Sequence, residues 1–304
     1  MDITSPIGLY GTPAASRMEV AGDAVQLSPL VVGSRALDEL PAESFQAITV
    51  LAPPGTLERR YVLAHALRIL SPGATLTAFA AKDKGGKRLA TELQQFGCDV
   101  QEASRQHDRI CTTQRPAMLR NIDDAIMEGG PQRHAAHGLW TQPGVFSWDR
   151  IDEGSALLLQ HLPPLHGHGA DLGCGLGVLA NAVLHAPQVQ RITLVDLDAR
   201  AITMAKRNVH DLRAEFLWAD ACGDLPLTAL DFVVMNPPFH ASGVEDKSLG
   251  QQFIIRASAL LKQGGQCWLT ANRHLPYEAL LAQHFAQHAR VAEANGFKIY
   301  RAEK

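Results

Sequence analysis

The chain has 304 residues, of which 46% are hydrophobic and 19% charged, as expected for a globular protein with one large or two medium domains. Its net charge of −3 provides no overall positive field for attracting nucleic acid, and it contains no apolar run of the roughly 18 residues that a membrane-spanning helix needs. The start of the chain lacks a basic stretch followed by an apolar one, and the five cysteines include no C-x-x-C pair, so we expect a cytoplasmic protein with reduced thiols.

The first half of the chain contains one strand–turn–helix–strand unit. Residues 45–52 form an apolar run that ends at a Pro-Pro-Gly sequence, and residues 57–70 have the composition of a helix. A Ser-Pro-Gly turn then leads to a second strand, predicted over residues 75–80. This order is typical of a βαβ unit in an α/β fold.

Two basic segments follow this unit. Residues 82–88 carry four positive side chains and one negative one, and residues 105–120 carry four arginines with Asp108. Such clusters can neutralise phosphates and hold RNA in register, but solvated surface loops have the same composition, so both interpretations stay open. The candidate RNA contacts are Lys82, Lys84, Lys87, Arg88, Arg105 and Arg109.

A Gly-Gly-Pro sequence at residues 129–131 marks a boundary in the chain. The polar, histidine-containing run that follows it indicates a linker rather than core, and divides the chain into domains at residues 1–130 and 131–304. The five histidines between residues 134 and 168 have no partnered cysteine or carboxylate at the spacing of metal ligands, so we expect no metal site.

A glycine-rich loop stands at the start of a predicted helix in the second half. Asp171 precedes Gly173, Gly175 and Gly177, and residues 178–184 form a good helical stretch. Glycines at alternate positions let the backbone approach a ligand, and the helix start presents free N–H groups. The spacing differs from the dinucleotide-binding G-x-G-x-x-G, and an aspartate two positions before the first glycine suits a ligand with a cationic amine better than a pyrophosphate.

The next predicted strand, residues 191–195, ends in an acid. Asp196 lies 19 positions after Gly177, close to the offset of roughly 20 residues at which an acid meets ribose hydroxyls in nucleotide-binding βαβ units. A helix cap is the alternative role, and Asp198 can supply it for the helix predicted over residues 199–205.

A further short strand is predicted over residues 215–219, with Asp220 at its carboxyl end. Open α/β sheets bind ligands at the carboxyl ends of their strands. Asp220 is therefore the candidate for binding an adenine amino group, with a solvated turn aspartate as the alternative.

The apolar run 230–235 ends in Asn236-Pro237-Pro238-Phe239, the most informative motif in the chain. The prolines bias Asn236 away from helix and stiffen the turn, so its side chain and the Pro237 carbonyl can act as paired acceptors for an NH2 group. Phe239 offers a face on which a base can stack. The motif indicates methylation of an exocyclic nitrogen on a planar base, although by itself it also fits an ordinary Pro-Pro turn.

The region after this motif repeats the plan of the first half. A helix predicted over residues 251–261 is followed by a Gly-Gly turn and a strand predicted over residues 266–270. We infer a duplicated fold, although βαβ units also resemble one another by chance.

The first copy of this fold lacks the motifs of the second. Aligning the two proline pairs places Ala52 opposite Asn236 and Gly55 opposite Phe239, so both the acceptor and the ring are missing. The nearest remnant of a glycine loop, residues 31–34, has one glycine. We therefore expect the first copy to have lost catalysis and cofactor binding.

These motifs, in this order, resemble the class I methyltransferases that use S-adenosylmethionine, and in particular the ribosomal RNA guanine-N2 methyltransferases of the small subunit. The resemblance includes residues 143–155, 275–277 and 296–302; it is nearly complete in the second half and looser in the first. In the family, the segment before the glycine loop packs over the cofactor, which implies that Phe146 and Asp152 contribute to the cofactor pocket.

The resemblance implies an α/β fold of two tandem Rossmann-like methyltransferase domains, each with a doubly wound mixed sheet, the N-terminal copy being degenerate and serving RNA docking or a scaffold role. The expected reaction moves a methyl group from S-adenosylmethionine to the N2 of a guanine in 16S ribosomal RNA. The substrate is expected to be either the free RNA or the small ribosomal subunit. The enzyme is expected to be a monomer that binds no metal and no membrane. In the cofactor site, Asp171 faces the methionine amine, the three glycines make room, Asp196 holds ribose and Asp220 reads adenine.

Three alternatives remain open. Adenine-N6 and protein glutamine-N5 methyltransferases present nearly the same motif, usually with Tyr where this chain has Phe239. The third is a non-catalytic RNA-binding or assembly protein that retains the fold, which cofactor affinity distinguishes from an enzyme.

Overall fold

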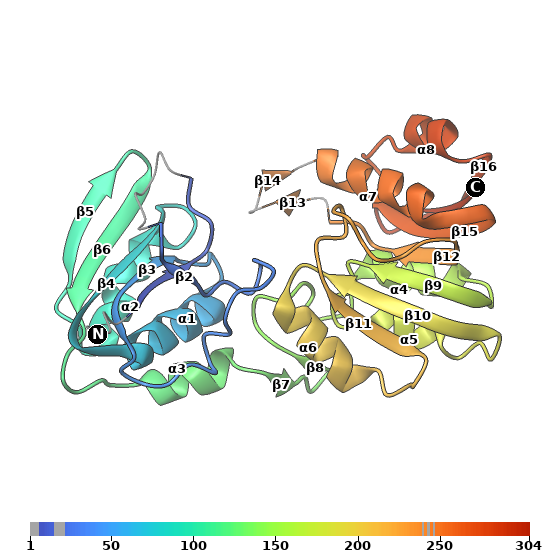
Figure 1. The fold of residues 1–304 in the computed structure, drawn as a ribbon. Coiled ribbons are helices and arrows are strands. Elements are labelled where there is room, and N and C mark those ends of the chain that lie inside the picture. The colour runs from blue at the N-terminus through green and yellow to red at the C-terminus, as the bar shows by residue number, and fades with distance from the viewer. Residues whose placement is uncertain (1–5, 15–21, 239, 242–243, 246) are drawn as a thin grey trace. The chain divides into compact units, whose positions relative to one another are not determined.

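The computed structural model of the protein describes residues 6–14, 22–238, 240–241, 244–245 and 247–304. The chain divides into two compact units. The N-terminal unit comprises Met1–Gln132 with Gln142–Gly144, and the C-terminal unit comprises Arg133–Thr141 with Val145–Lys304. Each unit is built on one main sheet with helices beside it (Figure 1). Within the described residues, no helix has the length and apolar character that crossing a membrane requires.

The N-terminal unit contains a six-stranded sheet in the order β2-β1-β3-β4-β6-β5. Strands β2, β1, β3 and β4 are parallel, and β6 joins β4 and β5 antiparallel to both. The strands are β1 (Ile7–Tyr10), β2 (Val25–Gln26), β3 (Phe45–Leu51), β4 (Leu70–Ala81), β5 (Gln101–Arg105) and β6 (Asp108–Gln114). The helices are α1 (Thr56–Ile69), η1 (Gly86–Arg88), α2 (Leu89–Gln95) and α3 (Ile122–Gly129).

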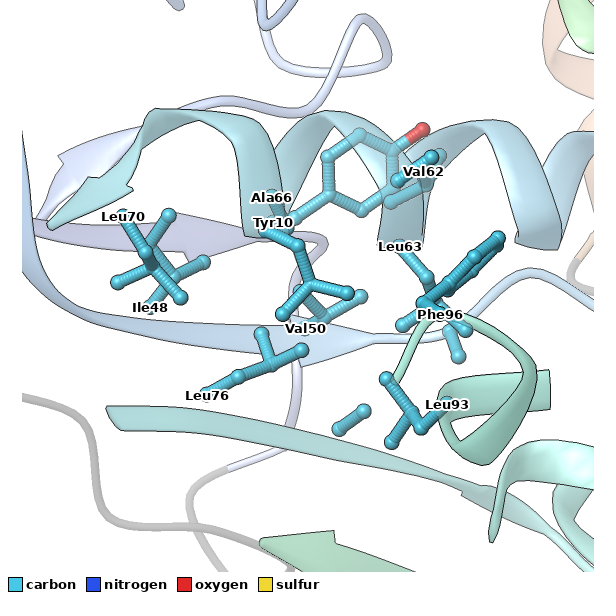
Figure 2. Close-up of a cluster of buried hydrophobic side chains, with 14 of the residues drawn as sticks. Tyr10, Ile48, Val50, Val62, Leu63, Ala66, Leu70, Leu76, Leu93 and Phe96 are labelled. Atoms are coloured by element: carbon cyan, nitrogen blue, oxygen red, sulfur yellow. The ribbon is translucent and has the colours of Figure 1, made fainter. Parts of the chain in front are cut away.

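Helix α1 is the centre of this unit. Its residues from Tyr61 to Leu67 are all buried, because one side of the helix packs on β3 and β4 and another packs on α3. Figure 2 shows Leu63 of α1 beside Phe96, and Ile48 of β3 beside Leu70, with Val50 of β3 between the two pairs. A helix covered on both sides has no single polar face, so the apolar residues of α1 follow no clear helical period.

The C-terminal unit contains a seven-stranded sheet in the order β11-β10-β9-β12-β15-β17-β16 (Figure 1). The first five strands are parallel, and β17 is antiparallel to both β15 and β16. These strands are β9 (Gly167–Leu172), β10 (Val189–Asp196), β11 (Ala214–Trp218), β12 (Leu230–Met235), β15 (Leu261–Asn272), β16 (Gln287–Ala294) and β17 (Phe297–Glu303). The helices are α4 (Glu153–His161), α5 (Val178–Val183), α6 (Ala199–Asn208), α7 (Lys247–Leu260) and α8 (Glu278–His284). The chain also forms two short strand pairs: β7 (Gln132–Arg133) with β8 (Trp140–Thr141), and β13 (His240–Ala241) with β14 (Val244–Glu245).

The two main sheets share one topology. Strands β2, β1, β3, β4, β6 and β5 take the places of β10, β9, β12, β15, β17 and β16, and β11 is the additional strand of the second sheet. The predicted α/β fold with two tandem copies and mixed sheets is therefore confirmed. The counterpart of β9 is β1, so the counterpart of the glycine loop starts at Gly11; residues 31–34, expected to be its remnant, follow β2 instead.

Two predicted turns belong to strands. Strands β4 and β15 start directly after α1 and α7 and include the Ser-Pro-Gly and Gly-Gly sequences that predicted turns. Leu70 pairs with Phe45 and Leu261 pairs with Leu230, and each ladder then shifts register before it continues. Proline and glycine are tolerated here because they lie at these irregularities.

Candidate functional site

The sequence motifs of the second half meet at the carboxyl end of the C-terminal sheet. Strand β9 lies between β10 and β12, so the chain leaves β9 toward one edge of the sheet and returns to β12 on its other side. Such a switch in strand order opens a crevice at the carboxyl ends of the central strands. The glycine loop follows β9, Asp196 ends β10, and Asn236 follows β12.

The glycine loop takes a conformation that requires glycine. Gly173, Gly175 and Gly177 all have positive φ, at 73°, 52° and 79°. The N–H groups of Gly173 and Cys174 both donate to the Val195 carbonyl, at 2.9 and 3.0 Å, which ties the loop to β10. The loop thus turns sharply from β9 into α5 with backbone dihedral angles that glycine adopts without strain.

Asp171 is fully buried within β9 and does not line the cleft between the glycine loop and α4. Its Oδ2 accepts a hydrogen bond from the Ala180 N–H at 3.1 Å, one of the free N–H groups at the start of α5. Its Oδ1 has no partner among the described residues. Burial, with a smaller contribution from the nearby Asp196 charge, raises the pKa of Asp171 to about 7. A buried carboxylate oxygen without a partner fits the predicted cationic amine.

Asp196 connects the glycine loop to the end of β10. Its Oδ2 accepts from the Gly175 N–H at 2.8 Å and its Oδ1 from the Asp198 N–H at 2.9 Å. Burial raises the pKa of Asp196 to about 6 despite these hydrogen bonds. Asp198 caps α6 by accepting from the Arg200 N–H at 2.9 Å, as predicted. Each oxygen of Asp196 keeps a second lone pair, which can accept from a hydroxyl.

A cleft separates the glycine loop from the start of α4. Phe146, Asp152, Gly173, Gly175 and Asn236, all predicted for the site, lie in its wall together. The other lining residues are Ser147, Arg150, Ile151, Ser155, Cys174, Leu176, Val178 and Leu179. Sequence reasoning missed Ser155 and Arg150, although both lie in the segment that carries Phe146 and Asp152.

Asp220 lies apart from this wall, just after β11. It is exposed, and its Oδ1 accepts from the Cys222 N–H at 2.9 Å, which is the turn role considered as the alternative. Leu197, which follows Asp196, is an exposed large hydrophobic residue, and its carbonyl accepts from the Trp218 Nε1–H at 2.8 Å.

The Asn236 side chain is held by residues of α4. Its Nδ2 donates to Asp152 Oδ2 at 2.7 Å and to Ser155 Oγ at 2.9 Å. Pro237, the second predicted acceptor, follows it and is buried. Phe239, the predicted stacking residue, lies outside the described residues.

The corresponding turn of the first copy is filled from within the N-terminal unit. The Arg59 guanidinium donates to the Pro53 and Pro54 carbonyls, at 3.2 and 2.7 Å, and forms two 2.7 Å hydrogen bonds with Glu92. Arg59 and Glu92 are both buried. The carbonyl that corresponds to the one predicted to bind an amine in the second copy is therefore occupied by an internal cation.

The basic residues predicted to contact RNA lie at one end of the N-terminal sheet. The Lys82 N–H donates to the His107 carbonyl at 3.0 Å, so residues 82–88 lie beside the β5–β6 turn. Lys87 and Arg105 are exposed, whereas Arg109 pairs with Glu102 at 3.0 Å. The structure thus brings residues 82–88 and 105–109 together, whereas Arg115 of the second basic segment is buried at the other end of β6 and pairs with Glu43. No group of metal-ligating side chains is found among the residues that the structure describes.

Comparisons with known proteins agree with this architecture. Residues 136–301 match the family of the methyltransferase small domain. The chain is 32% identical over 291 residues to the ribosomal RNA small subunit methyltransferase C of Pseudomonas paraeruginosa, covering 93% of this chain and 87% of that protein. It is 30% identical over 281 residues to the protein of the same name from Shewanella loihica, covering 88% and 80%. The fold is similar to that of a T. thermophilus 16S rRNA N2 methyltransferase solved with AdoMet and guanosine, with a TM-score of 0.79 at 23% identity, over 100% of this chain and 89% of that one.

Proposed function

This chain belongs to the ribosomal RNA small subunit methyltransferase C family, and we propose from that membership that it transfers a methyl group from S-adenosylmethionine to the exocyclic N2 of a guanine in 16S ribosomal RNA. The observation that carries the proposal is the Asn236 side chain, which stands at the wall of the cleft with its amide nitrogen turned toward Asp152 and Ser155. Its carbonyl oxygen is thereby turned away from α4 and can accept from an amine.

The residues around the cleft fit S-adenosylmethionine. The unpartnered Oδ1 of Asp171 suits the methionine amine, the glycine loop lets the backbone approach, and the Asp196 carboxylate can accept from ribose hydroxyls. We assign Phe146 and Asp152 to the wall of the same pocket and Asp220 to the adenine amino group. The cofactor supplies an electrophilic methyl group on a sulfonium.

The chain's own contribution to the reaction is orientation. The lone pair of a guanine N2 is delocalised into the ring, which makes the amine a poor nucleophile. The Asn236 carbonyl oxygen and the Pro237 carbonyl accept from its two N–H groups, oppose the delocalisation and aim the lone pair along the line of displacement. Phe239 stacks on the base, and the proton leaves to solvent. The reaction needs no covalent enzyme intermediate.

We propose a division of labour between the two copies. Residues 131–304 carry catalysis and cofactor binding, and residues 1–130 serve as scaffold and RNA docking domain, with their basic residues on phosphates. The enzyme acts in the cytoplasm, as a monomer, on ribosomal RNA or the small subunit. All five cysteines are unpaired, which suits a reducing compartment.

The substrate is tested with methyl-labelled cofactor. Label should enter ribosomal RNA, and mass mapping of the digested RNA should find N2-methylguanosine. Label in adenine or in protein glutamine would establish one of the two rival substrates. Absence of cofactor binding, with no transfer to any of the three substrates, would indicate a non-catalytic RNA-binding or assembly protein.

Replacement of Asn236 tests the proposed role of the motif. Asn236→Ala should lower the methyl-transfer rate by about two to three orders of magnitude, as expected for loss of one preorganised hydrogen-bonding group at a reacting centre. Cofactor affinity, measured by calorimetry, should change little because the glycine loop is untouched. Asn181→Ala, an exposed position on α5, is the matched control and should keep full turnover. Near-normal turnover of Asn236→Ala with normal cofactor binding would show that the assigned role is wrong.

A further inference from the structure

The amide of Asn236 is held from one side by the start of α4. Asp152 is the N-cap residue of α4, and its Oδ2 accepts both from the Ser155 backbone N–H at 2.8 Å and from Asn236 Nδ2 at 2.7 Å. The Ser155 hydroxyl lies 2.9 Å from the same nitrogen. One carboxylate oxygen therefore serves the helix cap and the Asn236 amide together, across 84 positions of sequence.

This arrangement determines which way the amide faces. A side-chain amide has a donating and an accepting end of nearly the same shape, and a serine hydroxyl can pair with either. A carboxylate oxygen can only accept, and Asp152 Oδ2 accepts both from the Ser155 backbone N–H and from the Asn236 amide. Asn236 must therefore present its NH2 group to α4 and its Oδ1 to the opposite side.

We infer that Asp152 and Ser155 are positioning residues that lock Asn236 as an acceptor for the substrate amine. The inference rests on the proposed function and extends it, because the motif alone leaves the amide free to rotate. With the amide reversed, its NH2 group would meet the NH2 group of the base, and two donors cannot form a hydrogen bond. Asp152 excludes that state, since reversal would also bring Asn236 Oδ1 against a carboxylate. The start of α4 thereby determines that Asn236, which follows β12, presents its carbonyl oxygen and not its NH2 group to the substrate amine.

A double-mutant cycle separates positioning from general structural damage. Asp152→Ala is measured in the wild-type background and in the Asn236→Ala background, as single-turnover methyl transfer to ribosomal RNA at saturating cofactor and RNA. In the presence of Asn236 the rate should fall by about 10- to 100-fold, as expected when a reacting group loses its orientation. In the Asn236→Ala background the same change should alter the residual rate by less than about threefold, because the group through which Asp152 acts is gone. An equal fall in both backgrounds, or no fall in either, overturns the inference.

Two further variants separate orientation from helix capping and from charge. Ser155→Ala keeps the backbone N–H that Asp152 caps and loses only the hydroxyl, so it should slow transfer by about fivefold with an unchanged melting temperature. In Asp152→Asn the carbonyl oxygen can replace Oδ2, because the Ser155 N–H still requires an acceptor there, so the rate at saturating cofactor should fall less than in Asp152→Ala and the side-chain NH2 protons of Asn236 should still exchange slowly with solvent. A fall in Asp152→Asn as large as that in Asp152→Ala would overturn the argument from acceptor geometry.

A measurement without substrate tests the inference independently of the reaction. The side-chain NH2 protons of Asn236, followed by NMR, should exchange slowly with solvent in the wild-type chain and faster in Asp152→Ala. Unchanged exchange overturns the inference even if the enzyme is active. Failure of the wild-type chain to methylate guanine contradicts the proposed function instead. In that case the NMR measurement still tests whether Asp152 fixes the orientation of the Asn236 amide.

Discussion

At the scale of single residues, two buried carboxyl groups stand out beside the glycine loop. The pKa of Asp171 is raised to about 7 and that of Asp196 to about 6, in both cases chiefly by burial. A carboxyl group whose pKa is higher in the folded than in the unfolded chain binds its proton more tightly when folded. Its contribution to stability is therefore present in acid and is lost as the pH rises from the ordinary value of 3.8 through about 7.

Cofactor binding should reverse this pH dependence. A cationic amine beside Asp171 favours the ionised carboxylate, so the affinity for S-adenosylmethionine should increase from about pH 5.5 to about pH 8, and so should the rise in melting temperature that the cofactor causes. Calorimetric titration and thermal unfolding over this range measure both quantities. Asp171→Asn, which keeps an oxygen for the Ala180 N–H, should flatten both curves. An unchanged slope in that variant would place the titrating group elsewhere.

At the scale of elements, the glycine loop uses its glycines for different reasons. A Cβ at Gly175 would meet no heavy atom within 4 Å, and this residue lines the cleft. A Cβ at Gly177 would lie 2.9 Å from Val209 Cγ2 and 3.3 Å from Leu194 Cδ2. Gly175 therefore leaves room for a ligand, whereas Gly177 lets the loop pack on its own unit.

Alanine at the two positions should have opposite effects. Gly177→Ala should destabilise the C-terminal unit by about 1 to 3 kcal/mol more than Gly175→Ala, since both have positive φ but only Gly177 is closely packed. Gly175→Ala should weaken cofactor binding by about tenfold or more, because its methyl group enters the space for the ligand. Thermal unfolding and calorimetric titration of both variants form the test, each variant being the control for the other. Equal losses of stability and affinity in the two would contradict the assignment.

The pairing of Arg59 with Glu92 in the N-terminal unit predicts a second contrast. Their side chains are 1% and 7% exposed, and Arg59 also holds the Pro53 and Pro54 carbonyls. Glu92→Leu leaves a buried guanidinium without its counter-charge and should cost about 3 to 5 kcal/mol of stability, whereas Arg59→Met with Glu92→Leu should recover much of that loss. Denaturant unfolding of the single and double variants provides the comparison. A double variant no more stable than the single one would mean that the carbonyl contacts of Arg59 dominate.

Secondary structure was predictable where local sequence determines it. The strand that ends at Asn236 was predicted over residues 230–235, as observed, because its apolar run ends at a proline pair. Strands β4 and β15 extend beyond their predicted starts, since Leu70 pairs with Phe45 and Leu261 with Leu230 before each ladder shifts register at the glycine-containing segment. Partners in the sheet, which lie far away in sequence, decide such boundaries.

At the scale of the whole molecule, the first copy keeps the fold while its binding features are replaced. Gly11 starts its counterpart of the glycine loop, and Arg59 occupies its proline carbonyls. Its basic segments at residues 82–88 and 105–109 meet at one end of the sheet. The first copy can still carry exposed basic side chains even where it lacks the motifs of the second copy. Phosphate binding therefore stays our prediction for this end of the sheet.

Charge reversal tests that prediction. Replacing Lys84, Lys87 and Arg88 together by glutamate should weaken RNA binding and reduce its salt dependence, by about one unit of the log–log slope for each phosphate that is no longer neutralised. Turnover at saturating RNA should survive, because these residues contribute uniform binding and not stabilisation of the transition state. Binding titrations over a range of salt concentrations measure the slope.

A control variant separates local from global charge. Glutamate at Arg35, Lys206 and Arg290 changes the net charge equally at exposed positions outside the basic segments, and should leave the slope nearly unchanged. If both triple variants give the same slope as wild type, residues 82–88 are ordinary solvated surface.

The sequence by itself determined the features that depend on contiguous residues. The sequence predicts the glycine loop, the acids at strand ends and the Asn-Pro-Pro turn, because each follows from local backbone geometry. It also predicts the duplicated order of elements, because the same order of strands, turn and helix occurs twice. Only the tertiary structure decided how distant side chains meet. It placed Asp171 inside the unit, filled the first copy's turn with Arg59, and joined Asp152 to Asn236. The physical reason is that hydrogen-bond partners across 84 positions are set by strand order and helix docking, which no local pattern encodes.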